Sequence, residues 1–503
     1  MGTLSDNMPV IVGVGQLVDR DASINDHIQP LEMLTRVARL AEQDSGKDSL
    51  LTRLDTIALV GVAGWHPQNP VNLLANSISA APRRQMTTGI GGQVGISLLN
   101  EVASRIVEGK SEVSLVAGCN NLRVLRKAIA ANIHLDWTKG GAGEAEVFEG
   151  DQPGSNDLEG QYGLTQPPEI YPLFENALRA RLGLSLPDHR KRMGELFTGF
   201  TEVASVNPYA WFPVRRSAKE LITETPENRM IAYPYTKYLN AILDTEQAAA
   251  VIVCSAAKAQ SLGIPREKWV FWQGGARSQE RAWWVSERPR FDECPSMKDT
   301  LYGALQNSGV TLDQIDYFDF YSCFPVAVEM ACEMLGLEVT DPRGFTVTGG
   351  LPYAGGPASA YTLHSVSAMT HLLRNREGGK GMVTGNGWYL TKHSACILSA
   401  DPPSLVTGKT ALTDPLPSRE MEKEPVQVDQ NAVGEGTIEA YTVLYNREGL
   451  PCRGIVLGKT VAGTRFMANT AENTSDLERF VEEEQVGRKG DITDSEKGKR
   501  FTL

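Results

Sequence analysis

Residues 89–118 read GIGGQVGISLLNEVASRIVEGKSEVSLVAG, a glycine-rich turn followed by a helical pattern and an apolar run. The turn covers Gly89–Gly95, a helix is expected near Ile96–Val107, and Val113–Gly118 is typical of a buried strand. The same succession returns in the second part of the chain, which indicates an internal duplication. Its members there are a turn at Gly349–Gly356, a helix near Tyr361–Leu373 and a strand at Gly381–Gly385.

The segments that precede the two turns also correspond. In the first half, the apolar runs Val10–Val14 and Leu54–Val60 flank a helix with one apolar face. In the second half, a helix with apolar residues on one face at 297–305 precedes a strand-like segment, Leu312–Phe318. Strands that alternate with helices predict an α/β fold with buried sheets and helices on their faces. The alternative is two unrelated α/β domains.

Two further segments differ from this pattern. Residues 125–240 are rich in Pro, Gly and Tyr, which predicts an irregular insertion with short helices that is either a substrate lid or a cover for the sheet. Residues 404–425 are typical of a linker. Beyond it, 426–503 contain alternating strand patterns at Thr437–Val443 and Gly454–Gly458, which predict a small β-barrel or hairpin with mobile final residues.

The composition limits the class of protein. The 503 residues include 49 Lys and Arg against 61 Asp and Glu, a formal charge of −12, which argues against a bulk grip on nucleic acid or on an anionic membrane. The seven cysteines form no CxxC pair, which favours reduced thiols inside the cell. The end Phe501-Thr502-Leu503 differs from the peroxisomal signal Ser-Lys-Leu, so a cytoplasmic location is expected over a peroxisomal one.

Residues 9–400 resemble the thiolase superfamily in the order of four landmarks. Gly92–Ile106 is similar to the nucleophile loop and its helix, and Asp244–Ser255 is similar to the acidic, Ala-rich turn and strand that close the first half. Met297–Phe324 resembles the helix, strand and Asn-Glu-Ala-Phe motif of the second half. Gly349–Pro357 resembles the loop that ends in Gly-His-Pro in the family.

The resemblance implies a particular architecture. It predicts a duplicated, five-layer αβαβα body, with residues 1–262 as the first half and 263–404 as the second. The first half includes the insertion at about 125–240. Residues 426–503 are similar to the additional C-terminal domain of a thiolase-like subgroup and are expected to form a small β-rich, barrel-like domain.

The resemblance also implies chemistry for which this chain lacks the usual side chains. Thiolases use a cysteine at a helix N-terminus, a paired histidine and a second cysteine to transfer acyl groups from coenzyme A thioesters. Gly92 aligns with the nucleophilic cysteine, and Gly356 aligns with the histidine. The loop of the second cysteine, residues 384–388, contains no thiol. Ordinary thiolase catalysis is therefore excluded if this alignment holds.

Other residues offer a replacement set. Cys323 is the candidate nucleophile, with His393 or His364 as the candidate acid or base, because imidazole can take a thiol proton near neutral pH. The alternative is a buried cysteine that acts as a small apolar residue and histidines that only satisfy local hydrogen bonds. The expected substrate contacts are Gly92, Tyr321, Gly356 and Asn386.

Two functions remain open on these grounds. The first is an acyl-CoA-dependent acyltransferase-like protein with a rebuilt site, and the alternative is a non-catalytic binder of acyl-CoA or an acyl carrier, or a partner subunit. A coenzyme A thioester is the expected ligand in both, and no permanently bound cofactor is expected. No His, Asp or Glu cluster has metal-binding spacing, so no metal site is predicted. The resemblance leaves a homodimer open.

Overall fold

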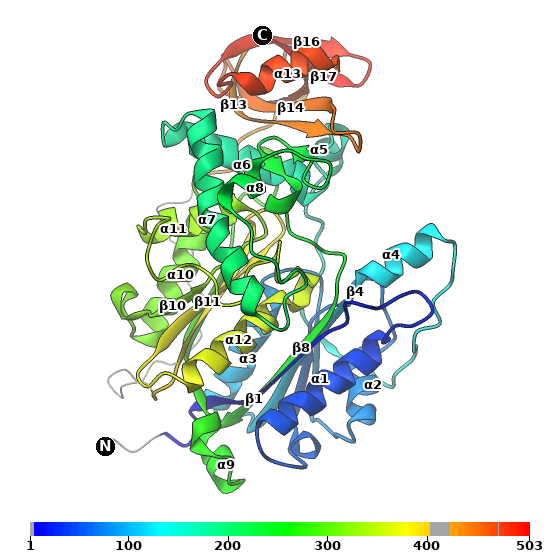
Figure 1. The fold of residues 1–503 in the computed structure, drawn as a ribbon, viewed down its shortest axis with the longest axis vertical. Coiled ribbons are helices and arrows are strands. Elements are labelled where there is room, and N and C mark those ends of the chain that lie inside the picture. The colour runs from blue at the N-terminus through cyan, green and yellow to red at the C-terminus, as the bar shows by residue number, and fades with distance from the viewer. Residues whose placement is uncertain (1–4, 403–422, 471) are drawn as a thin grey trace.

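The structure is a computed structural model that describes residues 5–402, 423–470 and 472–503. A ten-stranded sheet runs through the body of the molecule (Figure 1), in the order β10-β11-β12-β9-β1-β8-β4-β2-β3-β5. The strands of the first half are β1 (Pro9–Val18), β2 (Thr56–Leu59), β3 (Arg84–Thr88), β4 (Val113–Asn121), β5 (Glu146–Glu149) and β8 (Glu246–Ser255). Those of the second half are β9 (Val270–Gln279), β10 (Tyr317–Asp319), β11 (Lys380–Gly387) and β12 (Lys392–Ser399).

The strand pairings confirm the internal duplication. The first half contains the order β2-β4-β8-β1, and the second half contains β10-β11-β12-β9. In each set the first pair is parallel and the next two pairs are antiparallel. The two sets meet where β1 pairs with β9 in antiparallel orientation. Two copies of one unit therefore share a continuous sheet.

Helices cover the outer faces of the two halves of the sheet, and two more helices lie between the halves. The two helices that follow the glycine-rich turns, α3 (Val94–Val107) and α12 (Tyr361–Arg374), share one buried apolar cluster with residues from strands of both halves. Two further clusters lie on the outer faces. The outer helices are α1 (Pro30–Asp44) and α2 (Pro70–Ser77) on the first half, and α10 (Pro295–Ser308) and α11 (Pro325–Leu335) on the second. The body thus has the expected five αβαβα layers.

The insertion is more regular than the sequence suggested. It contains α4 (Leu122–Ala130), α5 (Asp157–Gln161), α6 (Pro167–Arg181), α7 (Leu186–Val206), α8 (Ala218–Ile222), β6 (Met230–Ala232) and β7 (Tyr235–Thr236), and α9 (Ala256–Ser261) follows β8. The prolines were interpreted as punctuation, but Pro167 and Pro187 lie in the first turn of α6 and α7. Proline is tolerated there because its missing N–H has no helical partner in any case. The insertion is therefore mainly helical.

The C-terminal segment forms a closed barrel, as expected. Its elements are β13 (Gly434–Tyr445), β14 (Pro451–Thr460), β15 (Arg465–Asn469), α13 (Thr474–Glu482), β16 (Lys489–Ser495) and β17 (Gly498–Thr502). The strand order β14-β15-β17-β16-β13 closes through pairing of β13 with β14. The prediction that the final residues are mobile was wrong, because β17 pairs with both β15 and β16 and buries Phe501.

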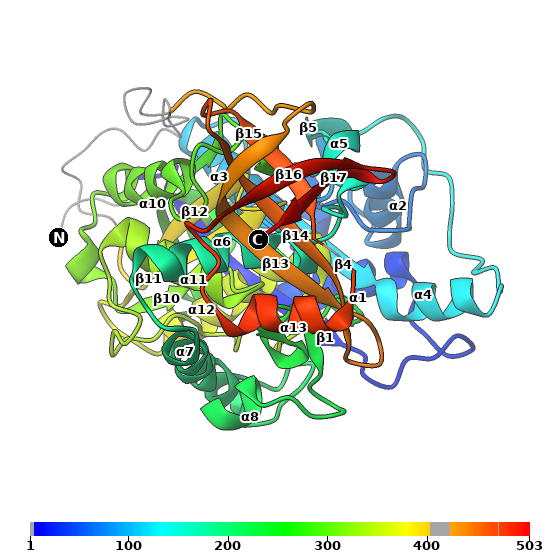
Figure 2. The same ribbon diagram turned by 90° about the horizontal axis from the view of Figure 1, so that it is seen from above.

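The barrel lies against the helices of the insertion (Figures 1 and 2). Backbone pairing, hydrogen bonds and shared apolar packing join it to the body. Leu444 of β13 pairs with Ala232 of β6, and the fully buried Arg465 donates hydrogen bonds to the carbonyls of Ser286 and Arg288. Four barrel residues belong to the same apolar cluster as the second half of the body: Ala440, Ile455, Leu457 and Met467. Most of the expected linker, residues 403–422, lies outside the described residues.

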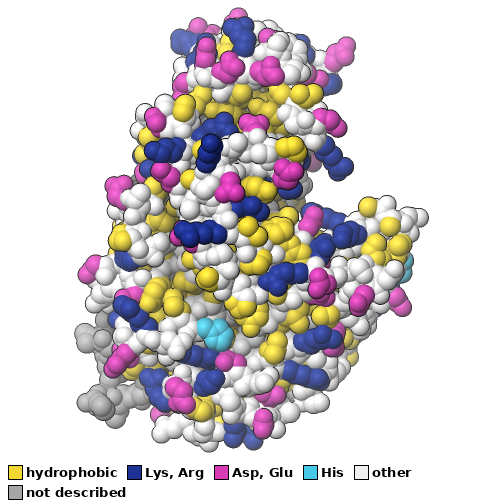
Figure 3. Space-filling view, viewed as in Figure 1, with side chains coloured by type: hydrophobic (Ala, Val, Ile, Leu, Met, Phe, Trp, Pro, Cys, Tyr) yellow, Lys and Arg dark blue, Asp and Glu magenta, His cyan; other side chains and the backbone are white. Residues whose placement is uncertain are grey.

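Charged side chains of both signs share the face of the molecule that Figure 3 shows. On the face shown in Figure 3, Lys and Arg side chains are interspersed with Asp and Glu side chains, and no broad basic patch appears there. Among the described residues, no helix has the length and apolar character needed to cross a membrane.

Candidate active site

Gly92 and Tyr321 lie against each other at the N-terminal end of α3. Gly92 is two residues before the first residue of this helix, and a Cβ atom at this position would overlap the phenol group of Tyr321 and the carbonyl oxygen of Asn386. Tyr321 lies two residues after β10, and its backbone N–H donates to Thr384 Oγ1 at 2.9 Å. The structure thus brings together three of the expected substrate contacts.

The loop after β11 is fixed against the start of α3. Ser394 Oγ donates to the Gln93 carbonyl at 2.8 Å, which ties β12 to the residue after Gly92. Asn386 Nδ2 donates to the phenol oxygen of Tyr171 at 2.9 Å, and Tyr171 donates in turn to the Trp388 carbonyl at 2.8 Å. The amide oxygen of the buried Asn386 has no hydrogen-bond partner. One acceptor is therefore available at this point.

Gly356, the remaining expected contact, lies in a tight backbone environment. Its N–H donates to the Ile242 carbonyl at 2.8 Å, and a Cβ atom here would lie 3.0 Å from the same oxygen. The preceding Gly355 has φ +102°, a conformation that favours glycine, and packs against Gln247. A Cβ atom at position 356 would therefore require the Ile242 carbonyl to move by a few tenths of an ångström.

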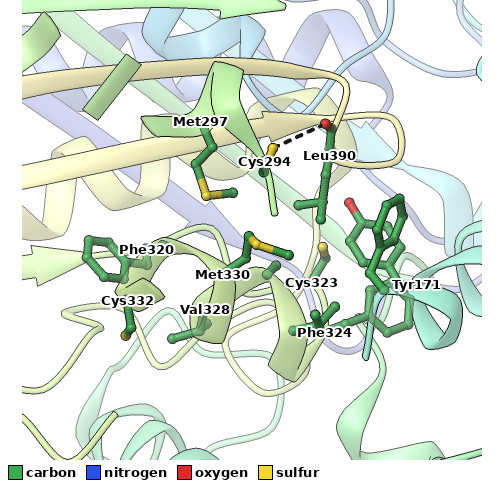
Figure 4. Close-up of a cluster of buried hydrophobic side chains, with 14 of the residues drawn as sticks. Tyr171, Cys294, Met297, Phe320, Cys323, Phe324, Val328, Met330, Cys332 and Leu390 are labelled. Carbon is green, nitrogen blue, oxygen red and sulfur yellow. Dashed lines mark hydrogen bonds between the residues drawn. The ribbon is translucent and has the colours of Figure 1, made fainter. Parts of the chain in front are cut away.

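Cys323 lies in an apolar environment beside Tyr171 (Figure 4). Burial raises the pKa of its thiol to about 12, against a smaller opposite effect of the hydrogen bond with Tyr171. The ring of Tyr171 stacks on that of Phe324, the next residue after Cys323, with ring centroids 4.4 Å apart. The thiol is therefore protonated near neutral pH, which is unfavourable for a nucleophile.

His393 contacts a different cysteine from the one expected. Its Nε2 lies 3.3 Å from Cys294 Sγ, and the same sulfur lies 3.2 Å from Glu280 Oε1. Burial lowers the pKa of His393 to about 4 and raises the pKa of Cys294 well above its usual value, so both are neutral near pH 7. The structure therefore forms a Glu280–Cys294–His393 group instead of a Cys323–His393 pair.

Sequence reasoning missed Cys294 and Glu280. Cys294 immediately precedes Pro295, the first residue of α10. A cysteine followed by proline at a predicted helix start was the available signal, because this position places the thiol near the positive end of the helix dipole. No comparable signal marks Glu280, which is brought to the sulfur only by the tertiary fold.

His364 is separate from this group. It lies on α12, and its Nδ1 is 2.8 Å from Gln16 Oε1 on β1. Burial lowers the pKa of His364 to about 3, so the ring is neutral. This geometry matches the reading of a histidine that satisfies a local hydrogen bond.

A cleft of about 760 Å³ opens next to the start of α3. Gln93 lines its wall beside Gly92, and His393 lines it beside Lys392. Glu149 accepts a hydrogen bond from Gln93 Nε2 at 2.8 Å and lies 3.8 Å from Lys392 Nζ. The other lining residues are Phe148, Gly150, Asp151, Gln152, Arg277, Ser278, Gln279 and Trp283. A second cavity of about 10 Å³ lies among Tyr321, Asn386 and His393, large enough for about one water molecule.

Comparison with known proteins shows which families this chain is similar to. The family model for the additional C-terminal domain of thiolase-like protein type 1 matches residues 415–497. Acetyl-CoA acetyltransferase of Schizosaccharomyces pombe is 26% identical over 144 residues, which are 28% of this chain and 33% of that protein. This chain therefore matches only a third of that relative's length.

Solved structures extend the similarity. The Ltp2-ChsH2(DUF35) aldolase matches with TM-score 0.59 and 18% identity, over 80% of this chain and 100% of that one. The dimeric peroxisomal thiolase of Saccharomyces cerevisiae matches with TM-score 0.54 and 13% identity, over 79% and 99%. These two show the fold. A monomeric SCP2-thiolase-like protein type 1 from Mycobacterium smegmatis matches over 100% of both chains, with TM-score 0.84 and 33% identity. The chain therefore belongs to the SCP2-thiolase-like proteins of type 1, thiolase-superfamily members with an additional C-terminal domain.

Proposed function

We propose that this protein is an acyl-CoA-dependent acyltransferase whose chemistry does not pass through a cysteine at the start of α3. In this proposal Gly92 replaces the usual nucleophilic cysteine and Gly356 replaces the usual histidine. The observation that carries it is the position of Tyr321, whose phenol fills the space beside Gly92 where that side chain would begin. An acyl group brought to this place would meet a phenol instead of a thiol.

The adjoining cleft supports a coenzyme A thioester as the ligand. Lys392 and Arg277 line it and offer positive charge to phosphate groups, and Trp283 and Phe148 offer aromatic surface. Both cations lie within 4 Å of Glu149, at 3.8 and 3.7 Å. Phosphate oxygens would compete with this carboxylate for them.

The groups around the small cavity suit acyl transfer, because Tyr321 can donate a hydrogen bond and His393 can accept a proton. Burial raises the pKa of Tyr321 well above its usual value, so the phenol stays protonated and can donate a hydrogen bond to a thioester carbonyl. The imidazole of His393 is neutral and can accept a proton from an incoming acceptor. Tyr321 and His393 line the same small cavity. We assign carbonyl polarisation to Tyr321 and the role of base to His393.

Binding and turnover test the proposal separately. We expect acetyl-CoA to bind in calorimetry, and thiolysis of acetoacetyl-CoA by CoA to stay at background. Lys392→Met should weaken acyl-CoA binding about tenfold, whereas Lys392→Arg should retain it, because the charge is what the phosphate meets. Absence of acyl-CoA binding by the wild-type protein, or thiolysis above background, would refute the proposal.

A non-catalytic acyl-CoA or acyl-carrier binder, or a partner subunit, is the second candidate. The burial of Cys294 and Cys323 favours it, because neither thiol is prepared for attack. The Ltp2-ChsH2(DUF35) aldolase, whose matched chain shares this fold, is named for two components. Bound acyl-CoA that is recovered unchanged in the presence of amine, thiol and CoA acceptors, with no effect of Tyr321→Phe, would select this candidate.

The edge of the sheet bears on the homodimer that the sequence left open. The outer edge of β3 is paired in parallel with β5, a strand of the same chain. The edge strand of the sheet is then β5, which has only 4 residues, and so short an edge strand disfavours pairing with a second subunit. We therefore propose a monomer in solution, as in the M. smegmatis relative, and light scattering after size-exclusion chromatography tests it.

A further inference from the structure

The group formed by Glu280, Cys294 and His393 is built from three separate elements. Glu280 directly follows β9, Cys294 directly precedes α10, and His393 lies on β12. All three side chains are at most 6% exposed. One atom from each that could bind a metal lies within 4.8 Å of the corresponding atoms of the other two. A thiol, an imidazole and a carboxylate are the three side-chain types that bind zinc in proteins.

The spacing of the donor atoms is close to that of ligands around one ion. Zinc binds sulfur at about 2.3 Å and nitrogen or oxygen at about 2.0–2.2 Å, so neighbouring ligands of a tetrahedral ion lie about 3.3–3.6 Å apart. Cys294 Sγ lies 3.3 Å from His393 Nε2 and 3.2 Å from Glu280 Oε1. A shift of a few tenths of an ångström would therefore admit an ion.

The Glu280 carboxylate is held by neighbouring residues. In metal sites, residues that hydrogen-bond to a ligand in this way fix its orientation. Ser296 donates two hydrogen bonds to Glu280 Oε1, from its N–H at 3.1 Å and its Oγ at 2.5 Å. Arg288 Nη1 lies 3.7 Å from the other oxygen of the same carboxylate. Ser296 and Arg288 thus fix the orientation of the Glu280 carboxylate.

A second buried group of similar composition does not share this geometry. His189 Nε2 lies 2.5 Å from Glu175 Oε1, and Tyr235 donates to the other oxygen of Glu175 at 2.5 Å. A separation of 2.5 Å is that of a hydrogen bond and is too short for two ligands of one ion. Glu329 completes this group without a thiol. It is a charge network and not a candidate metal site.

We propose that Glu280, Cys294 and His393 bind one zinc ion, with the fourth position filled by water. On binding, the ion replaces the thiol proton: the Cys294 S–H bond breaks, a sulfur–zinc bond forms, and the proton leaves to solvent. The inference does not depend on acyl-CoA binding. It does exclude the base role assigned to His393 above, because an Nε2 lone pair that binds zinc cannot also accept a proton. It revises the expectation of no metal, which rested on spacing along the chain.

Cobalt(II) titration of the full-length protein tests the site. Protein treated with a chelator and kept reduced should bind one Co²⁺ per chain, with a thiolate-to-cobalt band in the near ultraviolet and tetrahedral bands in the visible. Zn²⁺ should abolish both. Cys294→Ser should remove the thiolate band, and Glu280→Gln should weaken binding about tenfold or more. Cys396→Ser, which removes another buried thiol from the same strand as His393, should retain both bands.

Two outcomes would overturn the site. One is a wild-type protein without a thiolate–cobalt band, and the other is a band that persists in Cys294→Ser. If Cys294→Ser does not fold, His393→Gln serves instead, because it keeps all seven thiols and should lose the tetrahedral bands. The titration contains no acyl-CoA, so its result is independent of whether acyl-CoA binds.

Discussion

The phenol group of Tyr321 occupies the position at which a side chain on residue 92 would begin. The carbonyl oxygen of Asn386 closes the same space from another direction. Gly92 is therefore required by packing. Restoring a cysteine there would not restore a thiolase site, because the space that its sulfur needs is already filled.

Gly92→Ala should destabilise the protein by about 1–3 kcal/mol, because the added methyl must displace a buried ring and a backbone carbonyl. Gly92→Cys should cost at least as much and should give no thiolysis of acetoacetyl-CoA. Urea unfolding at pH 7 measures the free energy of unfolding of both variants.

Gly199→Ala is the matched control for this substitution. Gly199 lies on α7, and no atom lies within 4 Å of the place that a Cβ atom would take. Gly199→Ala should therefore leave the free energy of unfolding unchanged or raise it by about 0.5–1 kcal/mol. In a double-mutant cycle, Tyr321→Ala should recover part of the loss caused by Gly92→Ala. Strictly additive effects would show that the two residues do not share the space.

Thiol labelling separates the exposed cysteine from the buried ones. Cys452 is the one exposed thiol among the described cysteines, and the other six are buried. Iodoacetamide at pH 7 should therefore modify Cys452 first and reach Cys323 only on unfolding, because access limits the reaction. Mass spectrometry of timed digests measures the order, with Cys452→Ser as control. Fast labelling of Cys323 that acyl-CoA blocks would instead support a nucleophilic role.

The buried charge network should make stability depend on pH. Burial, with Glu175, raises the pKa of Glu329 to about 7 against the opposing effects of His189 and Arg192. Burial lowers the pKa of His189, but Glu175 and Glu329 outweigh it and raise that pKa above its usual value. The folded chain thus binds more protons here than the unfolded chain, so this contribution to stability is present at pH 5 and declines as pH rises through about 7.

Glu329→Gln tests the Glu329 part of this dependence. Glutamine cannot ionise, so the melting temperature of the variant relative to wild type should increase between pH 5 and pH 8. Glu448→Gln, on an exposed turn after β13, serves as control and should show a constant difference. A constant or decreasing difference for Glu329→Gln would contradict the assigned direction.

Removal of the barrel should expose apolar surface on the body. Truncation after Pro402 removes Ala440, Ile455, Leu457 and Met467 from the cluster that they share with the second half. It also removes the hydrogen bond from Asn176 Nδ2 to the Tyr441 carbonyl, leaving a buried amide without this acceptor. We expect aggregation in size-exclusion chromatography, and partial rescue by co-expression of residues 423–503. A monodisperse truncated chain with unchanged melting would show that the barrel folds apart from the body.

The duplication could be read from the sequence because it depends on local patterns. A glycine-rich turn, a one-faced helix and an apolar run recur in the same order, and the paired helices α3 and α12 appear where they were predicted. The strands of the C-terminal segment were foreseen for the same reason, since alternating residues mark them, but this pattern left a hairpin and a small barrel both open. The regularity of α6 and α7 was missed because Pro167, Pro168 and Pro187 lie in first turns, where proline starts a helix instead of ending one. Pro172 is the exception, since it lies inside α6.

The composition of the candidate site could not be read in this way. The sequence supplied Gly92, Tyr321 and Asn386 by their order in the chain, and the structure brings them together. It could not show that His393 faces Cys294 instead of Cys323, because that choice depends on which strand and helix ends meet across the sheet. The sequence by itself determined the repeated α/β elements through spacing along one segment. Only the tertiary structure decided the Glu280–Cys294–His393 group and the core shared with the barrel, because side chains far apart in the chain meet only when the layers pack.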